Sequence, residues 1–140
     1  MFRSACKSDI EQIFRLGLVQ FNELERSTGW ELERIESIIS EGISQVYEKS
    51  GLIVGFSLVT SICEFGDGFH VEWTAVSSNI KNGMGARLFI NVIEKLKRIK
   101  HSNVYIDVLI TNRPAINMVQ RYGFVESKRK DEFIIFKKTF

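Results

Sequence analysis

The strongest constraint on the fold is one long amphipathic helix that is flanked by strand-like segments on both sides. From Met84 to about Lys100, apolar side chains recur every three or four residues, and charged side chains occupy the opposite face. The strand-like segment Phe69–Val76 precedes this helix, and Val104–Ile110 follows it. A strand–helix–strand crossover places its two strands parallel in one sheet. We therefore expect one parallel strand pair near the middle of the chain.

The rest of the chain predicts antiparallel pairing around this crossover. Gln45–Glu48 and Leu52–Ser61 read as strands of a meander, and Phe124–Lys128 with Glu132–Lys138 read as a final hairpin. We also expect a strand at Phe2–Cys6 and a short helix at Pro114–Arg121 that is closed by Gly123. Two further helices should begin with the capping-box spacings Ser8–Glu11 and Thr28–Glu31, and the second of them should end near Gly42. Residues 1–140 thus predict one α+β domain, whose mixed, mainly antiparallel sheet has about seven strands and four flanking helices.

Composition and charge disfavour several classes of function. A formal charge of +2 over 140 residues argues against nucleic acid, although a binding domain that uses the basic residues near Lys95 and in the C-terminal hairpin is a distant alternative. Apolar runs fall far short of the ~20 residues that span a bilayer, so we expect no membrane association. Asp9 precedes any apolar signal-peptide core, which favours a cytoplasmic protein. Cys6 and Cys63 lack metal-ligand spacing, and we interpret both as buried structural thiols.

The turn that opens the long helix has the chemistry of an anion-binding loop. Gly83 and Gly85 stand at the start of the helix, where glycine permits a left-handed backbone and leaves no Cβ in the path of an approaching oxygen. The first N–H groups of a helix are unpaired and its dipole is positive there, so a pyrophosphate would be stabilised. Lys81 would add a positive charge. The alternative interpretation is a plain glycine-rich turn.

Two segments resemble the Gcn5-related N-acetyltransferase (GNAT) superfamily. Residues 80–85 are similar to its pyrophosphate loop, Arg/Gln-Gly-x-Gly-x-Gly/Ala, between a valine-ended strand and a long helix. Asn112–Phe124 is similar to a second element, in which Asn and Ala precede an aromatic residue and Gly-Phe. Two positions depart from the pattern. Ile80 and Lys81 replace the usual Arg or Gln and Gly, and Val119 replaces a tyrosine that serves many members as general acid, with Tyr122 three residues on.

The resemblance implies an acyl-CoA-dependent N-acyltransferase with a splayed parallel strand pair that holds acyl-CoA. The simplest activity is acetyl transfer from acetyl-CoA (coenzyme A) to a primary amine by direct attack in a ternary complex, and a catalytically weak or inactive acyl-CoA-binding module is the alternative. The acceptor would be a small-molecule, protein or peptide amine, and the protein a monomer or homodimer. The implied acyl-CoA-binding residues are Thr74, Ala75, Val76, Lys81, Asn82, Gly83, Met84, Gly85, Ala86, Asn112 and Val119, with the backbone N–H of Val76 on the acyl carbonyl and Asn112 also capping the short helix.

Direct transfer needs a base for the amine and a proton for the departing thiolate. By two-residue alternation, His70, Glu72, Thr74 and Val76 would share one strand face, and the resemblance places the family's base near the first two. We take Glu72 and His70 as candidate bases, with a solvated Glu72 and a strand-capping His70 as the alternative. Tyr122 is a candidate acid, with a packed aromatic and a water-borne proton as the alternative.

The resemblance also places acceptor selection in the first two helices and their connection. The acidic residues there would suit a cationic amine, and a solvated helix-capping face is the alternative. They are Glu23, Glu25, Glu31 and Glu33. Trp30 would either line the acceptor pocket or hold the second helix in place.

Overall fold

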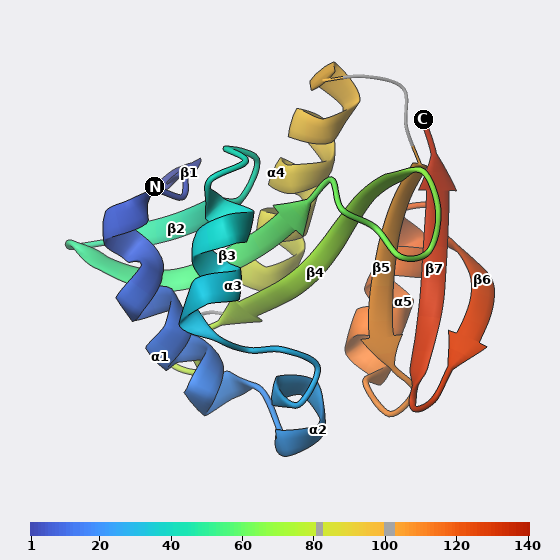
Figure 1. Ribbon diagram of the computed structural model, residues 1–140, viewed down its shortest axis with the longest axis horizontal. Coiled ribbons are helices and arrows are strands. Elements are labelled where there is room, and N and C mark those ends of the chain that lie inside the picture. The colour runs from blue at the N-terminus through green and yellow to red at the C-terminus, as the bar shows by residue number, and fades with distance from the viewer. Residues whose placement is uncertain (81–82, 100–102) are drawn as a thin grey trace.

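The computed structural model describes residues 1–80, 83–99 and 103–140. Seven strands form one sheet in the order β1-β2-β3-β4-β5-β7-β6 (Figure 1). The strands are β1 (Phe2–Ser4), β2 (Gln45–Lys49), β3 (Leu52–Thr60), β4 (Gly68–Val76), β5 (Asn103–Leu109), β6 (Val125–Lys130) and β7 (Phe133–Thr139). The helices are η1 (Lys7–Asp9, a 3-10 turn), α1 (Ile10–Gln20), α2 (Glu23–Arg26), α3 (Leu32–Ile39), α4 (Met84–Ile99) and α5 (Arg113–Arg121).

This architecture confirms the predicted α+β fold and its central crossover. β4 and β5 are parallel, and every other strand pair is antiparallel. The short helix α2, which the sequence pattern did not predict, raises the number of α-helices above four. Within the described ranges, no helix is both long and apolar enough to cross a bilayer.

Helices cover both faces of the sheet and define two cores (Figure 1). The apolar stripes of α1 and α3 pack on the central strands of one face, with Phe56 and Leu58 of β3 fully buried beneath them. The stripe of α4, with Leu88, Phe89 and Val92 at 0% exposure, packs on the other face, and α5 packs beside it. Burial of these stripes is what stabilises helices of such modest length.

The two predicted capping boxes are wrong. Asp9 accepts a hydrogen bond from the backbone N–H of Cys6 at 2.9 Å, so the chain turns into η1 before the expected Ser8–Glu11 box. Asn22 and Glu25 form the second box at 2.8 and 3.0 Å, and this box starts α2. α3 has no side-chain cap at its start, and its buried isoleucines pack it into the core on this face of the sheet. The first strand is also shorter than predicted and ends at Ser4.

A β-bulge in β4 separates side chains that the sequence pattern placed together. Leu58 of β3 pairs with Trp73 and Val59 pairs with Val71, so Glu72 has no partner residue across the ladder. An unpaired residue reverses the alternation of side chains after it. Val71 accordingly packs in the α4 core, whereas Trp73 packs in the α1 and α3 core. The prediction that residues 70, 72, 74 and 76 share one face is therefore wrong, because the bulge lies between them.

The parallel strands separate shortly after they pair. β4 and β5 are in register only from Gly68 and Asn103 to Val71 and Ile106. Beyond this point β4 stays with β3 and β5 stays with β7, and the two strands diverge as in an inverted V (Figure 1). The backbone groups that face the opening have no neighbouring strand to bind. This opening positions the candidate site.

Candidate functional site

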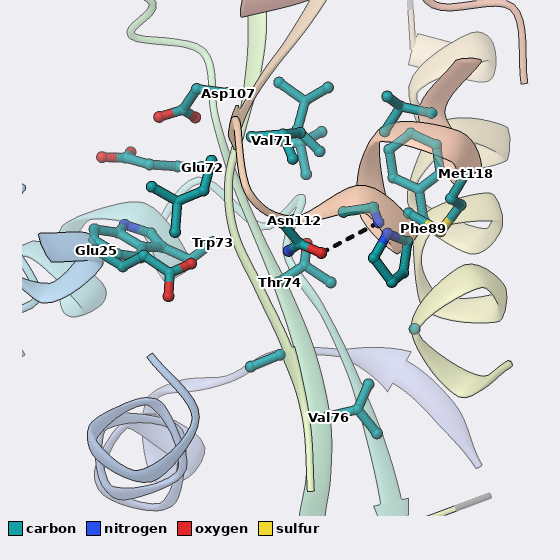
Figure 2. A pocket seen from close by; sticks show the side chains of 18 of the residues that line it. Glu25, Val71, Glu72, Trp73, Thr74, Val76, Phe89, Asp107, Asn112 and Met118 are labelled. Carbon is teal, nitrogen blue, oxygen red and sulfur yellow. Dashed lines mark hydrogen bonds between the residues drawn. The ribbon is translucent and has the colours of Figure 1, made fainter. Parts of the chain in front are cut away.

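A cavity of about 460 Å³ occupies the opening between the diverging strands (Figure 2). Its walls come from β4, the end of β5, the first turn of α4 and the helix α5. Of the positions that the sequence predicts to bind acyl-CoA, those that line it are Thr74, Ala75, Val76, Gly83, Gly85, Ala86, Asn112 and Val119. Met84 does not line it, because its side chain is buried beneath α4, and Lys81 and Asn82 lie outside the described residues.

Two backbone N–H groups of β4 face this cavity. The N–H of Ser77 donates to the carbonyl of Val54 at 2.8 Å, which makes these residues a hydrogen-bonded pair. Hydrogen-bonded and non-hydrogen-bonded pairs alternate in an antiparallel ladder, so the next pair, Val76 with Gly55, is non-hydrogen-bonded. The N–H groups of Val76 and, one alternation back, Thr74 therefore point away from β3 into the opening. The opening thus has donors for the carbonyl oxygens of an extended ligand.

The first turn of α4 supplies further donors at the same cavity. Gly83 has φ +93°, in the left-handed region that favours glycine, and no atom lies within 4 Å of the position of a Cβ there. The first helical hydrogen bond runs from Arg87 N–H to the carbonyl of Gly83 at 3.1 Å. The N–H groups of residues 84–86 precede this bond and have no acceptor among the described residues of the helix, which is the arrangement that binds phosphate oxygens.

The helix α5 forms the opposite wall. Asn112 caps it by accepting from the N–H of Ala115 at 3.3 Å, which leaves its side-chain NH₂ group directed at the cavity region (Figure 2). Val119 is fully buried and gives this wall an apolar surface. Tyr122 lines neither this cavity nor the second cavity described below, and its ring packs with its centroid 6.1 Å from that of Phe89. This placement favours the packing role for Tyr122 over that of a general acid.

A second cavity, of about 550 Å³, meets the first where β4 and β5 separate. Thr28, Glu72, Asp107 and Phe133 line both cavities. Glu72 is ion-paired to Arg34 of α3, and His70 lies 2.7 Å from Asp107, measured from Nε2 to Oδ1. His70 itself is only 5% exposed, and it lines the second cavity but not the first. Two carboxylates thus stand at the junction, each with one basic partner.

The expected acceptor region is only partly at the site. Glu25 lines the first cavity, whereas Glu23, Glu31 and Glu33 are exposed and line neither. Trp30 is buried in the α1 and α3 core and its indole N–H donates to the carbonyl of Phe14 at 3.0 Å, so it holds the start of α3 against α1.

Asp107 is the residue at the site that sequence reasoning missed. It follows Val104, Tyr105 and Ile106 in an otherwise apolar strand. A single carboxylate in a buried strand is unusual unless it is paired, and that was the available signal. The hydrogen bond between His70 and Asp107 joins residues 37 positions apart on two strands, and no local pattern reveals such a contact.

The two cysteines are not at the site. Cys6 is exposed and Cys63 is only partly buried, so the expectation that both thiols are buried is wrong. Burial raises the pKa of the Cys63 thiol, which makes it a weak nucleophile at neutral pH. Among the described residues no group of acidic, histidine and cysteine side chains has the arrangement of a metal site.

The architecture is that of the GNAT acetyltransferases. A GNAT-family acetyltransferase from Listeria monocytogenes superimposes with a TM-score of 0.81 over 100% of this chain and 94% of its own, at 16% identity. The PaiA N-acetyltransferase from Thermoplasma acidophilum, solved in complex with coenzyme A, gives 0.78 over 100% and 98% at 11% identity. A ribosomal-protein-alanine N-acetyltransferase from Brucella melitensis gives 0.77 over 100% and 99% at 17% identity. No protein-family model and no curated protein matches the sequence.

Proposed function

We propose that this protein is an acyl-CoA-dependent N-acyltransferase that moves an acetyl group from acetyl-CoA to a primary amine. One observation carries the proposal: a single cavity unites the outward N–H groups of the splayed strand β4 with the unpaired N–H groups of α4. This combination suits a ligand with carbonyl groups at one end and a pyrophosphate at the other. Acetyl-CoA is such a ligand, and the fold neighbour from Thermoplasma acidophilum was solved with coenzyme A.

The two groups of backbone donors would bind different parts of acetyl-CoA. The N–H groups of residues 84–86 would hold the pyrophosphate, and those of Thr74 and Val76 would hold the pantetheine and thioester carbonyls. Donors in the main chain are fixed by the fold, so they are already in place when charge develops on the thioester oxygen.

The chemistry is direct transfer in a ternary complex. The neutral amine attacks the thioester carbon, the C–S bond breaks, and the departing thiolate takes a proton. Glu72 is the candidate base, because its carboxylate stands where the two cavities meet. His70 would act through Asp107, to which its Nε2 is bound. With Tyr122 packed away from the cavity, we assign protonation of the thiolate to water.

The acceptor is a small-molecule or peptide amine that enters from the second cavity. No described residue of α4 lines that cavity, so acetyl-CoA at the α4 turn and an acceptor in the second cavity could be bound together. The ribosomal-protein-alanine acetyltransferase among the fold neighbours is consistent with a peptide acceptor.

Two measurements test the proposal. Calorimetry with acetyl-CoA should detect binding, and saturating acetyl-CoA should raise the melting temperature, since a ligand that binds only the folded state stabilises it. Release of free thiol in a screen of primary amines should then report transfer. Binding without any thiol release would support the alternative of an inactive acyl-CoA-binding module. Absence of both binding and stabilisation would refute the proposal.

A further inference from the structure

We propose that Glu72 and Asp107 together form the binding site for the ammonium group of the acceptor, and that the acceptor is a small primary amine whose body is apolar and carries no carboxylate. This inference rests on the proposed function, and it names the substrate class and a binding residue that the GNAT resemblance did not supply.

The carboxylate of Glu72 has one oxygen that lacks a partner. Both the Nε of Arg34, at 2.9 Å, and its Nη2 donate to Oε1. Oε2 is buried, and it is the one buried side-chain nitrogen or oxygen without a hydrogen-bond partner in residues 1–80, 83–99 and 103–140. The side chain of Glu72 is only 9% exposed. Leaving a buried carboxylate oxygen unsatisfied is costly, so this atom indicates a ligand that donates to it.

Asp107 offers the second acceptor. Its Oδ1 is bound to Nε2 of His70 at 2.7 Å, and the buried ring of His70 lies edge-on to that of Phe65, with centroids 5.0 Å apart. In the tautomer protonated at Nε2, His70 donates this hydrogen bond and fixes the carboxylate. Asp107 is 21% exposed, so it combines a fixed orientation with access from the cavities.

The strand register brings the two carboxylates to the same level. Val71 and Ile106 are the last partners of the parallel ladder, and Glu72 and Asp107 are the next residue of each strand. Figure 2 shows both carboxylates pointing to the same side of the opening. With His70 neutral, the carboxylates of Glu72 and Asp107 and the guanidinium of Arg34 carry a net charge of −1. A bound ammonium ion would neutralise the junction and give Oε2 a donor.

The lining of the second cavity indicates what chemical character the rest of the acceptor has. Apolar side chains of Ile62, Phe65, Phe133 and Ile135 line it, and Ile62 is 75% exposed at its edge. The two strongly basic side chains in its lining are already paired: Arg34 with Glu72, and Lys130 with Glu64 at 3.2 Å. An acceptor that carries its own carboxylate would find no unpaired cation among these residues. An aromatic or aliphatic amine without a carboxylate fits both features.

The experiment compares para-fluorophenethylamine, a cation at neutral pH, with the corresponding neutral alcohol by fluorine NMR titration. The amine should bind the wild-type protein at least about tenfold more tightly than the alcohol, and Asp107→Asn and Glu72→Gln should each lower amine affinity about tenfold while leaving alcohol affinity unchanged. His70→Ala should lower the affinity for the amine but not for the alcohol. His70→Gln keeps a hydrogen-bond donor, so it should lose less amine affinity than His70→Ala. Glu94→Gln, an exposed charge change on α4, is the matched control and should change neither affinity.

Acetyl-CoA calorimetry on every variant separates two kinds of failure. Retained acetyl-CoA binding shows that the variant is folded and that its acyl-CoA site is intact, so a loss of amine affinity then belongs to the ammonium site. If the wild type binds amine and alcohol equally or binds neither, or if Asp107→Asn leaves amine affinity unchanged, the ammonium site is refuted even when acetyl-CoA binds. If acetyl-CoA does not bind the wild type, the proposed function itself fails.

Discussion

Gly85→Asp should separate the folding of α4 from its role in anion binding. Gly85 lies in the first turn of α4 at the cavity, and a Cβ there would meet Cγ2 of Val76 at 3.8 Å, an ordinary van der Waals contact. Replacing a helical glycine by aspartate gains only about 0.3 kcal/mol of helix propensity, and a carboxylate in the first turn is further favoured by the helix dipole. The variant should therefore unfold at the same or a higher temperature than the wild type in the absence of ligand.

The carboxylate introduced by Gly85→Asp should also repel the pyrophosphate of acetyl-CoA and weaken its binding. At a separation of about 6 Å and an effective dielectric constant of about 20, each phosphate charge would be repelled by about 3 kcal/mol, which corresponds to a loss of about 10²-fold in affinity. Calorimetry with acetyl-CoA measures this loss, and it should shrink as salt is added. Gly85→Asn is the matched control, since it adds a side chain of the same size without charge, and it should lose less than about tenfold. Equal, wild-type affinity in both variants would remove the α4 turn from the site.

Three further predictions concern catalysis, packing and pH. Glu72→Gln should lower kcat by about 10²-fold at saturating amine while acetyl-CoA affinity stays unchanged; a wild-type kcat in the thiol-release assay would exclude Glu72 as the base. Gly17→Ala should destabilise the fold by about 2 kcal/mol in urea unfolding, because the new Cβ would lie 2.1 Å from Cζ2 of Trp30; no loss would mean that the indole can shift freely. Burial opposes the charged form of Asp9, but bonds from Arg3 and from the N–H of Cys6 outweigh it and hold the pKa of Asp9 below its ordinary value of 3.8. The ionised carboxylate thus stabilises the fold above pH 3.8, and this contribution is lost as the pH falls through the lower folded pKa. Asp9→Asn should therefore cost about 2 kcal/mol near pH 7 and progressively less in acid, and a pH-independent cost would contradict the assignment.

The sequence by itself determined most secondary-structure elements and the fold class. α4 begins at Met84 and β3 at Leu52, as the spacing of apolar residues predicts, because helix and strand periods are local properties of the chain. The parallel pair also followed from local order, since a strand–helix–strand crossover admits one common topology. Backbone features of the site, such as the glycine turn, were visible for the same reason.

Only the tertiary structure decided which side chains meet at the site. The bulge at Glu72 depends on how β4 aligns with β3, and one unpaired residue moves every later side chain to the other face. The capping boxes failed because several polar residues before α1 and α3 could have served, and packing selected among them. Trp30, in the loop before α3, entered the core instead of the pocket because Gly17 of α1 leaves room for its ring. Asp107 gained its role from His70 and Glu72, which lie on a different strand, and contacts between distant segments arise from packing that no local period encodes.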